Sequence, residues 1–370
     1  MSEENPLEHL DDQYEVINRL HEGGMGAIYK VRHRFLEQIR VVKVLHSKLS
    51  SESEFQERFQ REARLATSVR HPNIAEVYDF SIKEGTAFLI MEYIEGVNFG
   101  QLLESGGPPK IETTLEMCIQ ALKAIGHIHE RSLVHRDISP DNLMLTKDDL
   151  GRPLVKLIDL GIVKPLAEDT TLTKTGLFMG KLHYASPEQF GRTEEGVELD
   201  QRSDLYSFGI VLYQMLTGEV PYSGSESAVI AGHLFHPPRD FERTDPDHRI
   251  PSGLRAMVLR SIEKKADDRY QTAQDFSDAL RSHLTGEAPP EPKKTGTAPG
   301  SEEATAVAPN AERSKHSDAL LSGAERLAQL GEFDEARSQL ETVLTLDPTH
   351  TGAQQLLRRV CDTQLAPLLG

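Results

Sequence analysis

The chain has 370 residues, 38% of them hydrophobic, which is enough for a substantial core in two domains or in one large domain with an appendage. No window is apolar enough to span a membrane, the acidic stretch 1–12 predicts no secretory signal, and the distant Cys118 and Cys361 predict no disulfide framework or metal cluster, so we expect a soluble cytoplasmic protein. The formal net charge of −17 disfavours nucleic acid and anionic membrane surfaces as partners.

A strand, a glycine-rich turn and a second strand are predicted near the beginning of the chain. Residues 14–20 have a strand pattern, and the following stretch 21–29 contains Gly23, Gly24 and Gly26. Because glycine has no Cβ, backbone amides in such a turn can approach phosphate oxygens. An ordinary hairpin is the alternative interpretation.

A lysine and a glutamate on the next two elements are predicted to pair. Lys43 lies within a β-branched strand, 40–45, and Glu62 lies in a predicted helix, 54–69. Glu62 shares its helical face with apolar residues, namely Phe55, Phe59, Ala66 and Val69. A carboxylate on a buried face requires a partner, and Lys43 is the candidate.

The octet 135–142, His-Arg-Asp-Ile-Ser-Pro-Asp-Asn, has the character of a catalytic loop. It follows an amphipathic helical segment and precedes an apolar run, 143–145, so a polar loop is held between packed elements. Within it, Asp137 and Asn142 place a carboxylate and a carboxamide at short spacing. A second apolar strand, 154–158, is followed by Asp159 shortly before a glycine, where a carboxylate can be a plain turn residue.

The following segments, taken in order, complete the pattern. The polar stretch 162–188 holds several threonines and closes with Tyr-Ala-Ser-Pro-Glu. A helix that is apolar nearly all round begins at Asp204 and stops at Gly218, and Arg269 follows two aspartates. Together with a strand at 88–93, these segments resemble the bacterial eukaryotic-like (Hanks-type) serine/threonine protein kinases over 14–284.

The resemblance implies an α+β, bilobal protein kinase fold, with a small antiparallel β lobe carrying one helix and a large helical lobe. It implies a serine/threonine protein kinase of bacterial signalling that transfers the γ-phosphoryl of ATP to protein hydroxyls, uses Mg²⁺ (or Mn²⁺) and autophosphorylates its activation segment. Residues 1–13 are then an N-terminal extension.

The resemblance also implies roles for individual residues. Asp137 would orient the substrate hydroxyl and accept its proton, Lys43 paired with Glu62 would hold the α and β phosphates, and Asn142 and Asp159 would bind the metal. The implied nucleotide-binding residues include Met91 as gatekeeper and the hinge backbone; they are Gly23, Gly24, Gly26, Ile28, Val41, Lys43, Met91, Glu92 and Ile94.

Supporting contacts follow from the same resemblance. Asp204 would brace the backbone of the catalytic loop, and Arg269 would pair with Glu188 at the end of the activation segment. Arg136 would offer a guanidinium to a phosphate in that segment, for which Thr171 and Thr173 are the candidates. Solvated threonines without a regulatory role are the alternative.

Several positions depart from the family pattern. His21 stands where the glycine-rich loop has its first glycine, and Leu160 replaces a phenylalanine. Serine/threonine kinases carry lysine where this chain has Ser139 and threonine where it has Lys181. We interpret the last two as an exchange in which Lys181 supplies the positive charge and Ser139 the hydroxyl. Independent decay of both positions is the alternative, and it would favour a pseudokinase scaffold.

The remainder of the chain is predicted to form a linker and a small helical segment. Residues 285–315 are rich in Gly, Thr, Ala and Pro and are predicted to be disordered. Residues 316–366 resemble one tetratricopeptide repeat with a following helix, for docking on the kinase, binding a protein partner or self-association; a simple helical hairpin is the alternative. A small-molecule kinase is disfavoured by the full activation segment.

Overall fold

The computed structural model describes residues 10, 12–23, 26–45, 60, 63–83, 86–159, 179–190 and 199–286, together with five residues further on: 321, 340, 352, 353 and 356. The chain divides into two compact units, Met1–Lys293 and Lys294–Gly370, and this boundary falls inside the predicted linker. In the second unit the five described residues are helical, and Leu340, Ala353 and Leu356 are buried. The rest of the predicted 316–366 segment lies outside the described residues.

The first unit begins with a five-stranded antiparallel sheet. Its strands are β1 (Tyr14–Gly23), β2 (Gly26–His33), β3 (Ile39–Leu45), β4 (Val77–Lys83) and β5 (Thr86–Glu92), in the order β1-β2-β3-β5-β4. Alternate residues of β2 and β3 are apolar and bury one face of the sheet, namely Ala27, Tyr29 and Val31 on β2 and Val42 and Val44 on β3. The prediction of a small antiparallel β lobe is confirmed, although β1 extends three residues beyond the predicted strand.

Two features adjust the predicted boundaries of this lobe. Leu10, assigned from sequence to an N-terminal extension, is 4% exposed and packs with Tyr14 and Val31 in the core of the sheet. It belongs to the lobe because an apolar side chain gains by this burial. Residues 63–68 are helical, and Ala63 and Ala66 pack against the sheet; Phe55, Phe59 and Glu62 of the predicted helix lie outside the described residues.

A second, smaller sheet leads into the helical part of the unit. It is formed by β6 (Val97–Asn98), β7 (Leu143–Lys147) and β8 (Pro153–Leu157), in the order β6-β7-β8. Helix α3 (Phe99–Gly106) begins with a capping box between Asn98 and Gln101. Helix α4 (Ile111–His129) buries its apolar face, including Cys118, whose thiol is fully buried and has its pKa raised by that burial.

The large lobe is built around α6 (Gln201–Thr217), which is buried nearly all round, as predicted from its sequence. Asp200 caps its N-terminus, and Gly218 ends it in the left-handed conformation (φ 85°) that favours glycine. The other helical elements are α5 (Met179–Leu182), η4 (Pro187–Phe190), α7 (Glu226–Leu234), α8 (Phe241–Thr244), α9 (Ser252–Ser261), η5 (Ala266–Asp268) and α10 (Ala273–Thr285).

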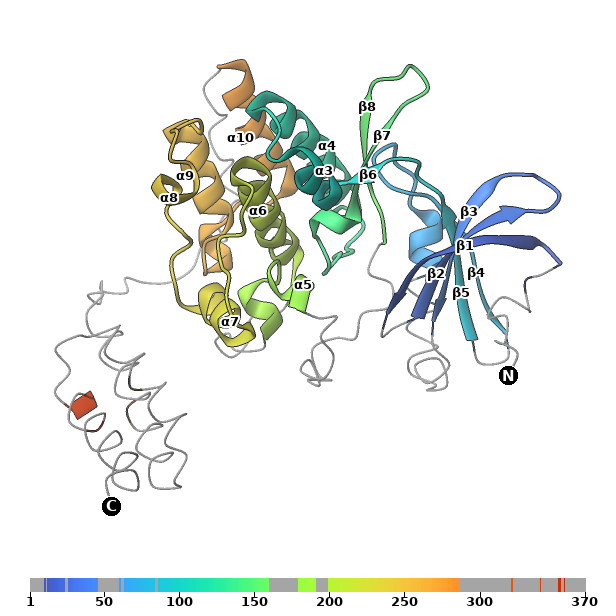
Figure 1. The fold of residues 1–370 in the computed structure, drawn as a ribbon, viewed down its shortest axis with the longest axis horizontal. Coiled ribbons are helices and arrows are strands. Elements are labelled where there is room, and N and C mark those ends of the chain that lie inside the picture. Colours follow the sequence, from blue (N-terminus) through green and yellow to red (C-terminus); the bar gives the residue numbers. More distant parts are fainter. Residues whose placement is uncertain are drawn as a thin grey trace, which may run out of the picture. The chain divides into compact units, whose positions relative to one another are not determined.

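The two lobes are joined through the smaller sheet. Figure 1 shows β1–β5 on one side of the unit, the large-lobe helices on the other, and β7 and β8 between them. Leu157 of β8 donates to Asn73 O (2.8 Å) and accepts from Ala75 N (2.9 Å), so the chain before β4 is tied to the large lobe. Among the described residues, no helix is both long and apolar enough to cross a membrane.

Candidate active site

The loop 135–142 is fastened from below by one buried carboxylate. Asp204, in the first turn of α6, is fully buried and accepts hydrogen bonds from the backbone amides of His135 and Arg136, each at 2.8 Å. It also contacts His129 Nε2 of α4 at 2.8 Å. Burial would raise the pKa of Asp204, but these donors outweigh burial and lower it. The predicted brace of the loop by Asp204 is confirmed as a contact.

The same loop holds the carboxylate and the carboxamide that the sequence singled out. Asp137 and Asn142 are both 7% exposed, and Asn142 Nδ2 donates to Asp137 O at 2.7 Å. Asn142 is the last residue of η2 (Pro140–Asn142), and its carbonyl accepts from Ile158 N at 2.9 Å. That bond places Asp159, the next residue, beside the loop. The structure therefore brings Asp137, Asn142 and Asp159 together.

Lys43 reaches this group from the small lobe. Its ammonium lies 2.6 Å from Asp159 Oδ2, with side chains 15% and 22% exposed. Burial alone would raise the pKa of Asp159, but the charge and hydrogen bond of Lys43 outweigh it and the pKa falls to about 2. The sequence predicted Glu62 as the partner of Lys43; Glu62 lies outside the described residues, and the described partner is Asp159.

The backbone near these side chains is held in a conformation that L-residues rarely adopt. Arg136 has φ 62° and Asp159 has φ 57°. Such conformations are maintained only where surrounding interactions determine them, and they gather at functional sites. Here Asp204 binds the amide of Arg136, and Lys43 binds the side chain of Asp159.

Lys181 enters the site from the opposite side. Its ammonium, on α5, lies 2.5 Å from Asp137 Oδ2. Burial would lower the pKa of Lys181, but attraction to Asp137, with smaller contributions from Asp159 and Asp141, raises it. Lys181 therefore contacts Asp137, and its role in supplying the positive charge of the exchange stays a prediction. Ser139 is 2% exposed, and in the described part of the chain its hydroxyl has no hydrogen-bond partner, so it does not brace Lys181 as predicted.

The predicted nucleotide-binding residues line up across the small-lobe strands. Val41 pairs with Met91, and Ile28 pairs with Lys43. The N–H of Glu92 donates to Glu76 O at 2.8 Å, so this N–H is already engaged within the protein. The half-buried Ile94 follows two residues later.

The glycine turn is only partly described. Gly23 pairs with Gly26 at the ends of β1 and β2, while Gly24 lies outside the described residues. Gly26 has φ 148°, and a Cβ there would lie 1.8 Å from Val44 O of β3. Close strand packing therefore requires a glycine at 26, whatever the turn binds.

A second buried ion pair anchors the segment that carries Lys181. Arg269 donates to both carboxylate oxygens of Glu188, at 2.8 and 3.0 Å, and Ser203 Oγ donates to the same carboxylate at 2.6 Å. Arg269 is fully buried and Glu188 is 7% exposed. The predicted pair is confirmed. The threonines 170, 171, 173 and 175 and Leu160 lie outside the described residues.

Comparison with known proteins decides the family. The model of the protein kinase domain family matches residues 14–280. The chain belongs to the protein kinase family. It is 36% identical over 293 residues to the serine/threonine-protein kinase PknB of Mycolicibacterium smegmatis, covering 77% of this chain and 45% of that protein. A probable serine/threonine-protein kinase of Clostridium acetobutylicum is 35% identical over 277 residues, covering 73% of this chain and 40% of that protein.

Solved structures agree with this family. The crystal structure of the Mycobacterium tuberculosis PknI kinase domain matches with a TM-score of 0.57 and 25% identity, covering 73% of this chain and 96% of that one. The bilobal kinase fold predicted from sequence is thereby confirmed for the first unit. The chain spans less than half the length of the curated relatives just named.

The donor set of this kinase site fits a nucleotide with a divalent cation. Asn142 commits its amide nitrogen to the loop, which leaves its oxygen as the available ligand, and the lowered pKa of Asp159 keeps that carboxylate ionised. Among the described residues no cluster of three or more His, Cys, Asp or Glu side chains could hold a metal. Two oxygen ligands completed by phosphates and water suit Mg²⁺ in such sites.

One contact of the kinase hinge was not predicted. Lys156 of β8 lies 2.6 Å from Glu92 Oε1 and donates to Oε2 at 2.8 Å, and Glu92 Oε2 also accepts from Glu76 N. This ion pair joins the end of the small-lobe sheet to the large lobe. A lone lysine in a short strand gives no sequence signal for such a partner, because alternation along β8 predicts only that it faces away from Val155.

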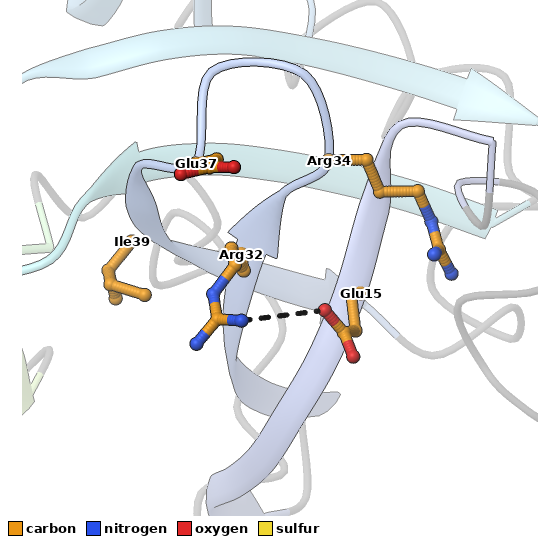
Figure 2. A pocket seen from close by; sticks show the side chains of 5 residues that line it. All are labelled: Glu15, Arg32, Arg34, Glu37 and Ile39. Carbon is orange, nitrogen blue, oxygen red and sulfur yellow. Dashed lines mark ion pairs between the residues drawn. The ribbon is translucent and has the colours of Figure 1, made fainter.

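A polar hollow on the outer side of the small lobe is separate from this site. It is lined by Glu15, Arg32, Arg34, Glu37 and Ile39, at the opposite end of the β1–β2 ribbon from the glycine turn. Figure 2 shows Arg32 facing Glu15, at 3.9 Å with both side chains more than half exposed. Exposed pairs of this kind contribute little to stability, and we assign the hollow no part in the chemistry.

Proposed function

We propose that the protein is an ATP-dependent serine/threonine protein kinase that transfers the γ-phosphoryl group to hydroxyls of protein substrates. The observation that carries this proposal is that Asp159 lies beside the buried loop that holds Asp137 and Asn142, with Lys43 paired to Asp159. Bound ATP with Mg²⁺ or Mn²⁺ would supply the activated phosphoryl group and neutralise part of its charge.

The chain's own residues would perform three tasks. Asn142 and Asp159 would hold the cation, and Lys43, already beside Asp159, would hold the α and β phosphates. The glycine-rich turn would let backbone amides approach the phosphates, because Gly23, Gly24 and Gly26 have no Cβ. Catalysis would then consist of positioning and electrostatics acting within a preorganised loop.

Asp137 is the proposed base. Its side chain is 5% exposed, it is held on the loop that Asp204 braces, and its carboxylate has one oxygen in contact with Lys181. A carboxylate in that position can orient a substrate hydroxyl and accept its proton as transfer proceeds. The adenine ring would lie between Val41, Ile28 and Met91, facing the backbone of Glu92 and Ile94.

Regulation and partners extend the same proposal. Autophosphorylation at Thr171 or Thr173, recognised by Arg136, would order the activation segment. The segment 316–366 would act as a tetratricopeptide-like module for a protein partner or for self-association, which the burial of Leu340, Ala353 and Leu356 supports. A cytoplasmic location is part of this proposal.

The test is incubation of the purified protein with labelled ATP and Mg²⁺, followed by mapping of phosphorylated residues. We expect phosphothreonine between 170 and 175, and a loss of about 10²–10⁴-fold in transfer for Asp137→Asn. Asp149→Asn, an exposed change in the β7–β8 turn, is the matched control and should leave transfer unchanged.

A pseudokinase scaffold is the second candidate function. It is favoured by the contact of the Lys181 ammonium with the carboxylate of Asp137. Under that reading the protein binds ATP but labels neither itself nor generic basic substrates. Such a result would replace the kinase proposal.

A further inference from the structure

The catalytic loop of this chain carries no lysine of its own. Between His135 and Asn142 its cationic side chain is Arg136, and Ser139 stands two residues after the proposed base. Ser139 is 2% exposed, and no described residue bonds its hydroxyl. Ser139 is therefore a small, buried and uncharged residue at this position, and a cation at the carboxylate of Asp137 is supplied by another element.

Lys181, on α5, is the cation that contacts Asp137. Its ammonium contacts Asp137 at 2.5 Å and also lies in the field of Asp159 and Asp141. An ammonium has three donors, and with the described residues Lys181 makes one hydrogen bond, to Asp137, while its side chain remains 43% exposed. The cation is therefore held at the base and open to a ligand.

We propose that Lys181 is the catalytic cation that contacts the transferred phosphoryl group, in place of a lysine on the catalytic loop, and that Ser139 is small because Lys181 occupies this position. This inference rests on the proposed kinase function and deepens it. In the transfer, the substrate oxygen forms a bond to the γ phosphorus while the bond to the β–γ bridging oxygen breaks. ADP keeps that electron pair, Asp137 takes the substrate proton, and Lys181 offsets the negative charge on the moving group.

The placement makes the end of the activation segment a part of the chemistry. Lys181 lies on α5, and three residues later Tyr184 donates to Gln214 Oε1 of α6 at 2.7 Å. Glu188, bound by Arg269, closes the same stretch. The position of the Lys181 ammonium relative to the γ phosphate thus depends on how residues 181–188 are anchored to the large lobe.

The first test compares nucleotides with and without a γ phosphate. Calorimetry measures Kd for a non-hydrolysable ATP analogue and for ADP, each with Mg²⁺, on wild type, Lys181→Met and the exposed control Lys123→Met. We expect Lys181→Met to weaken the ATP analogue about tenfold, equivalent to about 1.4 kcal/mol, with ADP changed less than about twofold. Equal losses for both nucleotides, or no loss, would overturn the inference.

The second test moves the charge back to the loop. Lys181→Thr and Ser139→Lys should each lower kcat, the first by removing the charge and the second by crowding two ammonium groups. The double variant should recover to within about tenfold of wild type, because neighbouring changes that compensate are not additive. A gain in kcat for Ser139→Lys alone, or a double variant no better than the weaker single one, would contradict the exchange.

The two proposals fail in different ways. If wild type transfers no phosphoryl group yet binds both nucleotides, the kinase proposal fails, while the nucleotide comparison still decides where Lys181 acts. If wild type binds neither nucleotide, both fail. Thermal melting of each variant without nucleotide shows that a lost affinity does not arise from unfolding.

Discussion

The two sides of the site are held in different ways. On the large-lobe side, the loop 135–142 is mostly buried and Asp204 binds two of its backbone amides. On the small-lobe side, residues 15–22 of β1, which lead to the glycine turn, are all exposed, and β1 pairs only with β2 at the edge of the sheet.

This difference between the two sides matches two separate requirements of the proposed phosphoryl-transfer site. Groups that act on reacting atoms must be preorganised, and in the proposed mechanism burial with satisfied hydrogen bonds would achieve this for Asp137 and Asn142. A strand that covers a nucleotide must admit and release it, and an exposed edge strand has little buried surface to lose when it does so. Most of the burial and hydrogen bonding therefore lies on the large-lobe side of the site. Substitutions on that side should lower the free energy of unfolding most.

The largest effect is expected at the buried pair of the large lobe. Replacing Arg269 by Met leaves Glu188 buried without its cation, which costs about 3–5 kcal/mol. Urea denaturation measures the loss. The exposed pair Arg281–Asp278 provides the control, since Arg281→Met should cost less than about 1 kcal/mol. Similar losses of stability in Arg269→Met and Arg281→Met would show that burial does not determine how much an ion pair contributes to stability.

A smaller but more specific effect is expected at the brace. Asp204→Asn retains one oxygen but loses a charge-assisted bond to the loop, so stability should fall by about 2 kcal/mol and kcat should fall with it. Asp240→Asn, which changes the residue that caps α8, is the matched control, because Asn and Asp cap helices equally well. If kcat is unchanged in Asp204→Asn, the loop does not depend on this carboxylate.

On the small-lobe side, Gly26→Ala tests the close packing of β2 on β3. The added Cβ meets Val44 O, and the φ of 148° disfavours any L-residue, so we expect a loss of about 1–2 kcal/mol. Nucleotide affinity should also fall, since the turn must shift. Thermal melting and calorimetry with ADP measure the two effects, and Gly106→Ala, where a Cβ meets no atom within 4 Å, is the control.

The smallest effect concerns pH and again lies in the large lobe. Burial, followed by the charge of Lys264, lowers the pKa of His233 to about 3 from its ordinary 6.5. The unfolded chain therefore binds a proton that the folded chain does not, so stability is full above pH 6.5 and falls as the pH drops toward 3.

Between pH 6.5 and 5.5 this histidine should contribute a loss of about 1 kcal/mol. His233→Asn should flatten the dependence of urea stability on pH, and the exposed His236→Asn should not. The slopes are compared rather than the absolute values, since the substitution also removes the contact of His233 with Tyr206. Parallel slopes in wild type and His233→Asn would refute the assignment.

Spacing along an element could predict the buried α6, whose apolar residues recur nearly all round the helix. The brace by Asp204 and the pair Glu188–Arg269 join distant parts of the chain, and they could be predicted because these residues match the motifs of the kinase family. The inward reach of Lys181 followed from an unusual residue at a known position.

What sequence could not predict depends on competition between partners. The sequence predicted Glu62 as the partner of Lys43, and spacing along the chain does not show that Asp159 binds this lysine at 2.6 Å. The hydroxyl of Ser139 was expected to bond, but whether a buried oxygen meets a donor depends on distances of a few tenths of an ångström. Leu10 is likewise a single apolar residue, and only tertiary packing places it in the core.

The buried thiol of Cys118 provides a built-in reporter on the helical lobe. Its position within α4 is inaccessible, and burial raises its pKa, so a thiol-alkylating reagent can react only after that helix is exposed. The rate of alkylation at Cys118, read by mass spectrometry, therefore measures how often the large lobe opens under native conditions. Because Cys118 is native to the chain, this measurement needs no engineered label. Nucleotide or partner binding can be followed as a change in the alkylation rate.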